Sequence, residues 1–468
     1  MSNPTYDYDL IVIGTGPSGQ KAAIIAAQLG KKVAVVERRM EIGGVCVNTG
    51  TIPSKTIREA VIKLTGYTER AFHGASYRVK ENITVDDLLS RCNKVIRREI
   101  NILKNHFMSH NIDVLYGNAR FMDPHTVEYE SPHGPKEATA ENIIIAVGTV
   151  PRDPDDIGID DDIILNSDSI LKLHRIPKNI IVIGGGVIGI EYASIFATLG
   201  VSVTLINRSD RMLRFVDSEI IDSLVNQMRE AGVTIRAPEE LDHVEVLSKE
   251  PRSAAVYLKS KKVVKADSVL FALGRMGATA DLNLEAAGLI SDKRGLIPVN
   301  EKYKTKADHI YAVGDVIGFP SLASTSYEQG RQAAYYMFDH SCPPIPTVFP
   351  YGIYSIPEIS YVGASELELT EKGIPYESGI ARYRETARGQ ILGDFTGLLK
   401  LLVDTEDNKI LGVHAIGTGA TEIIHIGQAI MGLGGTLDFI MDAVFNYPTL
   451  AECYKIAAQD VYNKLHYR

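Results

Sequence analysis

Three side chains that could do chemistry lie within ten residues of one another: a thiol, a hydroxyl and an ammonium group. They belong to Cys46, Thr51 and Lys55. A redox-active disulfide needs two sulfur atoms, on residues whose Cα atoms are roughly 4.4–6.8 Å apart. One sulfur and one hydroxyl cannot form this bond. The stretch therefore cannot carry out thiol–disulfide exchange by itself.

The cysteine usage of the whole chain narrows the class of protein further. No two cysteines form a Cys-x-x-Cys pair, which disfavours zinc and iron–sulfur ligation, and four cysteines in 468 residues are too few for a secreted disulfide framework. The four are Cys46, Cys92, Cys342 and Cys453.

Charge and hydropathy exclude two kinds of partner. The net charge of −9 argues against a nucleic-acid-binding surface and against a polybasic membrane anchor. The N-terminus lacks a basic leader with an apolar core, and no apolar run approaches the ~20 residues of a membrane helix. The sequence therefore predicts a cytoplasmic protein that binds neither nucleic acid nor membranes.

The elements before the reactive stretch form a dinucleotide-binding fingerprint. A buried-strand pattern runs into Gly-x-Gly-x-x-Gly, then a helix, then a second strand that ends in an acidic residue. Gly14 makes the turn, Gly16 lets the backbone approach a pyrophosphate, and Gly19 allows the helix to pack closely on the strand. Glu37 is expected to accept hydrogen bonds from ribose hydroxyls.

A second fingerprint occurs farther along, at Gly184, Gly186 and Gly189. Its second strand ends at Asn207 and Arg208, where an acid would bind the ribose 2′-hydroxyl of NAD and repel the 2′-phosphate of NADP. Asn207 is neutral, and Arg208 could approach a phosphate without excluding a hydroxyl. The sequence therefore predicts a site that accepts both coenzymes. The alternative is that Asn207 is only a polar turn residue and that preference is set elsewhere.

Two fingerprints in one chain predict an α/β fold with two Rossmann-like domains. The expected segments are residues 1–150 and 279–345 for the first nucleotide domain, 151–278 for the second, and 346–468 for a C-terminal α+β interface domain. The acidic run 153–162 is interpreted as a linker. Thr84 is expected to begin a long amphipathic helix that carries Cys92 on its apolar face.

The C-terminal segment is expected to hold an antiparallel sheet and two helices. The sequence predicts strands at 353–358 and 398–403 and helices at 420–431 and 451–465. His425 shares a helix face with Glu422, while His414 is isolated. Without further ligands, no metal site is predicted there.

The order of these motifs resembles the flavoprotein disulfide reductases, the family of dihydrolipoyl dehydrogenase and glutathione reductase. This resemblance implies FAD in the first site, a pyridine nucleotide in the second and a homodimer, with possible higher assembly. It also implies an ion pair between Lys55 and Glu191 beside the flavin and nicotinamide. The alternative for Lys55 is a solvated lysine at a helix start, and for Asp315 a helix N-cap. Further residues implied at the cofactors are Gly44, Cys46, Thr51, Ala119, Gly148, Gly274, Asp315, Leu322 and Ala323.

The chain departs from that family at two places. The family carries its second cysteine where this chain has Thr51, and its catalytic histidine where this chain has Tyr447, although Glu452 is retained. A phenol titrates near pH ~10 and is a poor base at neutral pH. The second sulfur and the general base for sulfur chemistry are both missing, while Cys46 stays beside the flavin.

These departures resemble the transhydrogenase branch of the family. The resemblance implies ping-pong hydride exchange through FAD, NADPH + NAD⁺ ⇌ NADP⁺ + NADH, with the two coenzymes as substrates. Three alternatives stay open. One is an NAD(P)H:quinone or dye oxidoreductase, another is a dihydrolipoyl dehydrogenase-like enzyme that recruits Cys453, and the third is a non-catalytic NAD(P) sensor.

Overall fold

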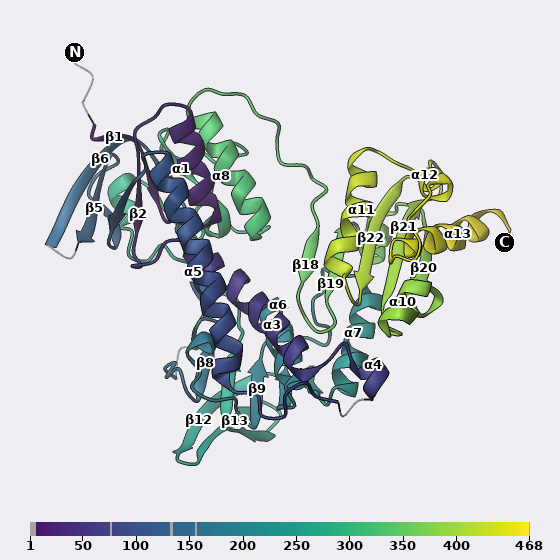
Figure 1. Ribbon diagram of the computed structural model, residues 1–468. Coiled ribbons are helices and arrows are strands. Elements are labelled where there is room, and N and C mark those ends of the chain that lie inside the picture. The colour runs from purple at the N-terminus through teal and green to yellow at the C-terminus, as the bar shows by residue number, and fades with distance from the viewer. Residues whose placement is uncertain (1–5, 75–76, 132–133, 155–156, 468) are drawn as a thin grey trace. The chain divides into compact units, whose positions relative to one another are not determined.

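The computed structural model describes residues 6–74, 77–131, 134–154 and 157–467 (Figure 1). Part of the expected acidic linker, residues 155–156, lies outside these described residues. The chain forms two compact units. Unit 1 comprises the described residues of Met1–Ile57, Leu89–Arg152 and Gly274–Ile345, and unit 2 those of Arg58–Leu88, Asp153–Leu273 and Pro346–Arg468. The four-segment division expected from the sequence stays a prediction.

Unit 1 is built on one sheet with the strand order β3-β2-β1-β6-β5-β4, and β17 also pairs with β6. The pairings β3–β2–β1–β6 and β6–β17 are parallel, while β4, β5 and β6 pair antiparallel. The strands are β1 (Tyr8–Ile13), β2 (Val33–Glu37), β3 (Asp113–Tyr116), β4 (Ala119–Phe121), β5 (Thr126–Ser131), β6 (Gly134–Ile145) and β17 (Ile310–Ala312).

Both faces of this sheet are buried, which explains the continuous apolar run of β1. Leu10 and Val12 belong to a core that also holds residues of the helices α1, α5 and α8, whereas Ile11 and Ile13 belong to the core on the other face. Helices α1 and α8 lie side by side (Figure 1). The helices of this part of the chain are α1 (Pro17–Gln28), α2 (Gly44–Asn48), α3 (Thr51–Thr65), α5 (Val85–Ser109) and α8 (Ala323–Met337), and the 3₁₀ turns are η2 (Leu284–Ala287) and η3 (Gly314–Ile317).

Unit 2 contains a second parallel sheet with the order β11-β10-β9-β15-β8. A three-stranded antiparallel sheet, β12-β13-β14, is inserted in the chain between β11 and β15 and shares the apolar core of the parallel sheet. The elements are β8 (Ile164–Asn166), η1 (Ser169–Lys172), β9 (Asn179–Ile183), α6 (Val187–Thr198), β10 (Ser202–Ile206), α7 (Ser218–Glu230), β11 (Thr234–Arg236), β12 (Leu241–Lys249), β13 (Arg252–Leu258), β14 (Val263–Ala266) and β15 (Ser268–Phe271).

The C-terminal part of unit 2 is an antiparallel sheet with the order β18-β19-β22-β21-β20, packed against α11 and α13. Its elements are β18 (Tyr351–Ile353), β19 (Ile359–Gly363), α9 (Glu366–Lys372), β20 (Tyr376–Arg382), η4 (Tyr383–Glu385), α10 (Ala387–Leu392), β21 (Leu398–Asp404), β22 (Ile410–Ile416), α11 (Ala420–Gly432), α12 (Leu437–Asp442) and α13 (Glu452–His466). Two short elements lie elsewhere, the antiparallel ribbon β7 (Thr149–Pro151) with β16 (Arg275–Gly277) in unit 1 and helix α4 (Arg70–His73) in unit 2.

The predicted α/β fold with an α+β C-terminal segment is confirmed, and the boundaries differ in two instructive places. Helix α1 begins at Pro17, because proline suits the first helical position. The strand predicted at 353–358 is wrong beyond its first residue: β18 ends at Ile353 and β19 begins at Ile359, and Pro357 between them has no N–H to donate to a ladder. Among the described residues, no helix has the length and apolar character that a membrane span requires.

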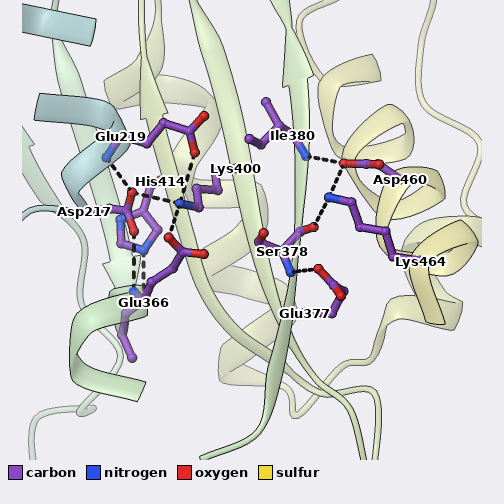
Figure 2. Close-up of polar contacts among 11 residues, drawn as sticks. Asp217, Glu219, Glu366, Glu377, Ser378, Ile380, Lys400, His414, Asp460 and Lys464 are labelled. Carbon is purple, nitrogen blue, oxygen red and sulfur yellow. Dashed lines mark hydrogen bonds and ion pairs between the residues drawn. The ribbon is translucent and has the colours of Figure 1, made fainter. Parts of the chain in front are cut away.

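A buried lysine fastens α7 to the C-terminal sheet within unit 2 (Figure 2). The Nζ atom of Lys400 on β21 lies 3.0 Å from Asp217, 3.2 Å from Glu219 and 2.8 Å from Glu366. The side chains of Lys400 and Asp217 are each only 1% exposed. Asp217 also caps α7 by accepting from the backbone N–H of Glu219. This cluster of charges holds the start of α7 against the sheet.

Candidate functional site

The first glycine loop is shaped by backbone contacts that side chains would disrupt. Gly14 has φ +105°, and a Cβ there would collide with the carbonyl oxygen of Ala146. A Cβ on Gly19 would collide with the carbonyl oxygen of Gly14, so α1 could not approach β1 as closely. A Cβ on Gly16 would meet none of the described atoms within 4 Å. Only Gly16 therefore has space beside it that a ligand could fill.

Glu37 closes this loop from the end of β2. Its Oε2 atom accepts from the backbone N–H of Thr15 at 3.2 Å and from the Thr15 hydroxyl, and its Oε1 atom accepts from the N–H of Arg39 at 2.9 Å. The Thr15 hydroxyl oxygen accepts in turn from the N–H of Gly43, at 2.9 Å. We call the bond between the strand-end side chain and the loop N–H the loop clasp. It leaves Glu37 buried at the edge of the loop.

A cleft of about 1090 Å³, partly open to solvent, begins at this loop. No described side chain caps the start of α1 at Gly16, and its first turn carries no acidic residue, so its N–H groups are available to an anion. The predicted residues that line the cleft are Gly14, Gly16, Glu37, Gly44, Cys46, Thr51, Ala119, Gly148, Asp315 and Ala323. Four predicted residues are not among the described residues that line the cleft, namely Gly19, Lys55, Gly274 and Leu322. Gly19 nevertheless shapes the loop. A cleft that begins at an uncapped helix start and reaches Cys46 and Asp315 fits a ligand that carries a phosphate at the end near Gly16.

Cys46 and Thr51 meet at this cleft. The Thr51 side chain forms a hydrogen bond with the Cys46 thiol. Burial raises the pKa of that thiol, helped by the charges of Asp315 and Glu99 and opposed by Thr51 and Lys55. The position expected to lack the second sulfur therefore lies in contact with the first, and the sulfur present is a thiol at neutral pH rather than a thiolate.

Asp315 lines the cleft within η3. The N-cap of η3 is Val313, so Asp315 is not the cap that the alternative interpretation expected. Its Oδ2 atom accepts from the Thr149 hydroxyl at 3.4 Å, and Arg275 donates to the same hydroxyl at 2.8 Å. Burial raises the pKa of the Asp315 carboxyl. Arg275 thus supports Asp315 through Thr149, a role that no local sequence pattern indicated.

The second glycine loop repeats the first. Gly184 has φ +115°, and a Cβ there would collide with the carbonyl oxygen of Ala272, while a Cβ on Gly189 would collide with that of Gly184. Among the described atoms, none lies within 4 Å of a Cβ built on Gly186, and no described side chain caps α6 there. The start of α6, which follows β9 through this loop, is therefore a second place where backbone N–H groups can bind an anion.

The loop clasp is repeated as well, with an amide in place of the carboxylate. The Oδ1 atom of Asn207 accepts from the N–H of Gly185 at 3.1 Å, and its Nδ2 atom donates to the carbonyl of Ser209 at 2.7 Å. Both clasps join residues 22 positions apart in the chain. Arg208 is 83% exposed beside this clasp and pairs with Glu240 at 3.7 Å.

The remaining predicted catalytic residues lie in well-defined surroundings. Glu191 is buried in α6 and accepts from the N–H of Tyr354 at 2.9 Å. Glu452 begins α13, and its Oε2 atom is buried without a hydrogen-bond partner among the described residues. Tyr447, five residues earlier, is 69% exposed. Lys55 belongs to unit 1 and Glu191 to unit 2, so their ion pair stays a prediction.

The histidines noted in the sequence have structural partners. His414 is fully buried and shares a hydrogen bond with the carbonyl of Ala364 at 2.9 Å, and His425 bonds to Gln428 at 2.8 Å. Within the described ranges, no group of three or more His, Cys, Asp or Glu residues is arranged to hold a metal ion.

Two glycine loops on two parallel sheets, followed by an antiparallel α+β segment, define a two-nucleotide oxidoreductase fold. The chain belongs to the pyridine nucleotide-disulphide oxidoreductase family. Its family model matches residues 8–330, and the model of the family's dimerisation domain matches residues 349–458.

Relatives over nearly the full length carry one name. The chain is 54% identical to the soluble pyridine nucleotide transhydrogenase of Mycobacterium tuberculosis, over 98% of both chains. It is 47% identical to that of Colwellia psychrerythraea and 44% identical to that of Escherichia coli, over 98% of this chain and 99% of theirs. Among solved structures, the flavoprotein disulfide reductase RclA of Escherichia coli is similar, with a TM-score of 0.87 and 26% identity over 97% of this chain and 99% of RclA.

Proposed function

We propose that this chain is an FAD-dependent soluble NAD(P)⁺ transhydrogenase of the Si type, which catalyses NADPH + NAD⁺ ⇌ NADP⁺ + NADH by a ping-pong route. Relatives of that name at 44–54% identity support the reaction class. The observation that carries the argument from this chain's own residues is the contact between Cys46 and Thr51, since the cleft offers a single sulfur whose pKa is raised.

The residues of the first cleft fit FAD, which when bound would supply a ring that can accept a hydride from one nicotinamide and return it to another. The start of α1 at Gly16 would hold the pyrophosphate, and Glu37 would face the ribose. Asp315, supported by Thr149 and Arg275, would bond the ribityl chain. Cys46 and Thr51 would pack against the ring and exclude water from it.

In the second site, the start of α6 would hold the pyrophosphate of the pyridine nucleotide. Asn207 and Arg208 would face the adenosine ribose, where a neutral amide admits both NAD and NADP. Lys55 and Glu191 would pair beside the nicotinamide and orient it. Glu452 is retained from the family's motif and is proposed as a further catalytic residue, with its Oε2 atom buried and without a hydrogen-bond partner among the described residues.

We also propose a homodimer in the cytoplasm. The match to the family's dimerisation domain supports the dimer, and large apolar side chains are exposed along the same segment. The most exposed are Leu433 at 88%, Val444 at 95%, Tyr447 at 69% and Phe439 at 57%. The proposed domains are the four segments expected from the sequence.

Rapid-mixing spectroscopy of the purified protein tests the function. NADPH should bleach the flavin absorbance, and NAD⁺ should restore it with formation of NADH and no other acceptor present. Lipoamide and glutathione disulfide should not be reduced. Turnover of either disulfide, or a long-wavelength thiolate-to-flavin absorbance band after two-electron reduction, would contradict the proposal.

A further inference from the structure

Glu240, which pairs with Arg208, belongs to a segment whose position relative to the second glycine loop is fixed by backbone hydrogen bonds. The ladder between β10 and β11 pairs Ile206 with Arg236, and it continues past the strand ends. The N–H of Asn207 donates to the carbonyl of Arg236, and the N–H of Glu239 donates to the carbonyl of Asn207, both at 2.9 Å. The segment that leads into β12 is therefore bonded to residue 207 on both sides.

Glu240 is held from the opposite direction as well. The N–H of Lys259 donates to the backbone carbonyl of Glu240 at 2.9 Å, and the Nζ atom of Lys259 lies 2.8 Å from its carboxylate. The same carboxylate oxygen lies 3.7 Å from the Nε atom of Arg208. One carboxylate thus stands between two cations at the end of β10. The hydrogen bond from Lys259 is the main cause of the lowered pKa of Glu240, and Arg208 contributes to it.

Because of the loop clasp, the Asn207 side chain contributes little to discrimination between NAD and NADP. Both polar atoms of its amide are bonded to the backbone, at Gly185 and Ser209. Arg208 is instead largely exposed, and its one ion pair among the described residues is the longer one with Glu240. A phosphate ester carries up to two negative charges and three acceptor oxygens, so it competes well for such a guanidinium. A ribose hydroxyl has no such advantage.

We propose that Glu240 is a specificity-determining residue of the pyridine nucleotide site. With NAD bound, Glu240 stays on Arg208 and neutralises it. With NADP bound, the 2′-phosphate takes Arg208 from Glu240, and the remaining carboxylate, still paired with Lys259, repels the phosphate. Glu240 therefore weakens NADP(H) binding relative to NAD(H) and keeps the two affinities close enough for one site to exchange both. This inference rests on the proposed use of both coenzymes by this site.

The test uses the full-length holoenzyme and two probes that differ only at the adenosine ribose, 2′,5′-ADP and 5′-AMP. Titration calorimetry of Glu240→Gln should show about three- to tenfold tighter binding of 2′,5′-ADP, the scale of one exposed charge pair, with binding of 5′-AMP changed less than about twofold. Glu245→Gln on β12 is the matched control, since it removes the same charge from a carboxylate that pairs with His243 and Tyr257 instead. It should shift neither probe.

The variant Arg208→Gln distinguishes the effect of the Glu240–Arg208 ion pair from direct repulsion between Glu240 and the 2′-phosphate. The gain in 2′,5′-ADP affinity from Glu240→Gln should be smaller in the Arg208→Gln background than in the native one. Equal gains in both backgrounds, or an equal shift of both probes by Glu240→Gln, would overturn the inference. Retained flavin absorbance and melting temperature verify that each variant is folded.

The failure of this inference can be told from failure of the proposed function. If the native protein exchanges hydride between NADPH and NAD⁺ but Glu240→Gln leaves both probes unchanged, only the inference is wrong. If the native protein binds 5′-AMP and not 2′,5′-ADP at millimolar concentration, the proposed use of both coenzymes is wrong.

Discussion

Cys46 and Thr51 decide which chemistry the first cleft can support. The two side chains are hydrogen-bonded, so the partner of the Cys46 thiol at this position is a hydroxyl and not a second sulfur. Cys46 is the one cysteine among the described residues that line the cleft, whereas Cys92 is buried in α5 and Cys453 in α13. Burial raises the pKa of Cys92 to about 11 and that of Cys453 to about 12. These thiols are poor nucleophiles at neutral pH.

Restoring the missing sulfur should not restore disulfide reduction. In Thr51→Cys the second thiol would face Cys46, yet Tyr447 still supplies no base near neutral pH. We expect no lipoamide turnover with NADH or NADPH above the background of the native protein, measured by coenzyme oxidation at pH 7.5. Measurable turnover by this single variant would show that the base is dispensable.

The raised pKa of Cys46 predicts slow alkylation. Iodoacetamide reacts with the thiolate, whose fraction at a given pH falls as the pKa rises. At pH 7.5, Cys46 in the folded protein should react more slowly than in the urea-unfolded protein, because its raised pKa lowers the thiolate fraction. The rate should still be rising at pH 9, and peptide mapping by mass spectrometry follows it. A plateau below pH 8 would indicate a stabilised thiolate.

At the scale of elements, helices α1 and α6 begin in the same way. We expect a substitution at the start of either helix to impair only the cofactor site of that helix. The starts of α1 and α6 both depend on a glycine whose Cβ would collide with the carbonyl of the first glycine of its loop, at Gly19 and Gly189. Each collision would force the helix away from its strand.

The pair Gly19→Ala and Gly189→Ala should therefore divide the two cofactor functions. Gly19→Ala should lose flavin, seen as loss of yellow colour, while Gly189→Ala should keep the colour but no longer be reduced by NADPH. Each should lose about 1–3 kcal/mol of stability from overpacking. Gly432→Ala at the end of α11 is the control, because a Cβ there meets none of the described atoms within 4 Å. Loss of flavin from Gly189→Ala would contradict the assignment of the sites.

The sequence predicted elements well where one physical signal dominates. The buried-strand pattern before the first glycine loop became β1, and the helix expected after Thr84 begins at Val85 as α5. The hairpin of β4 and β5 and the sheet β12-β13-β14 were missed, because their alternation is short and interrupted. Partners across the fold were missed for a different reason. Glu240 and Arg275 act through residues 32 and 126 positions away, and no local pattern encodes such pairs.

At the scale of the whole molecule, the buried Lys400 cluster ties helix α7 to the segment that matches the family's dimerisation domain (Figure 2). Burial would raise the pKa of Asp217 and lower that of Lys400, but their mutual attraction and hydrogen bonds outweigh it. The result is a lowered pKa for Asp217 and a raised pKa for Lys400. Both groups are therefore charged over the whole neutral range.

Lys400→Met should strongly destabilise the protein, because it leaves the Asp217 carboxylate buried without its cation. The expected loss is about 3–5 kcal/mol in chemical unfolding at pH 7. Asp217→Asn combined with Lys400→Met should recover part of it, and Lys409→Met, which removes an exposed lysine, should change little. A loss below that of Lys409→Met would contradict the role of the cluster.

The pH dependence of this difference follows from the two shifts. Because the pKa of Asp217 is lowered, its contribution is present above the unfolded-chain value near ~3.9 and is lost as the pH falls through the folded value. Because the pKa of Lys400 is raised, its contribution is present below ~10.4 and is lost as the pH rises through the folded value. The stability gap between native and Lys400→Met should thus be widest between about pH 5 and pH 10.

The proposed dimer can be tested on the same scale. Val444→Asp places a charge on the most exposed large apolar side chain of the described C-terminal segment. Light scattering should show a shift from dimer to monomer at micromolar concentration, whereas Val263→Asp, on the exposed face of β14, should stay dimeric. An unchanged mass for Val444→Asp would place the interface elsewhere.

The two clasps have a consequence for how such proteins diversify. Closing the loop requires an acceptor oxygen at the end of the second strand, and a carboxylate or an amide supplies it equally well. The fold therefore does not depend on the charge at this position. During evolution, a carboxylate and an amide can replace each other here, and coenzyme preference can change while the protein stays folded.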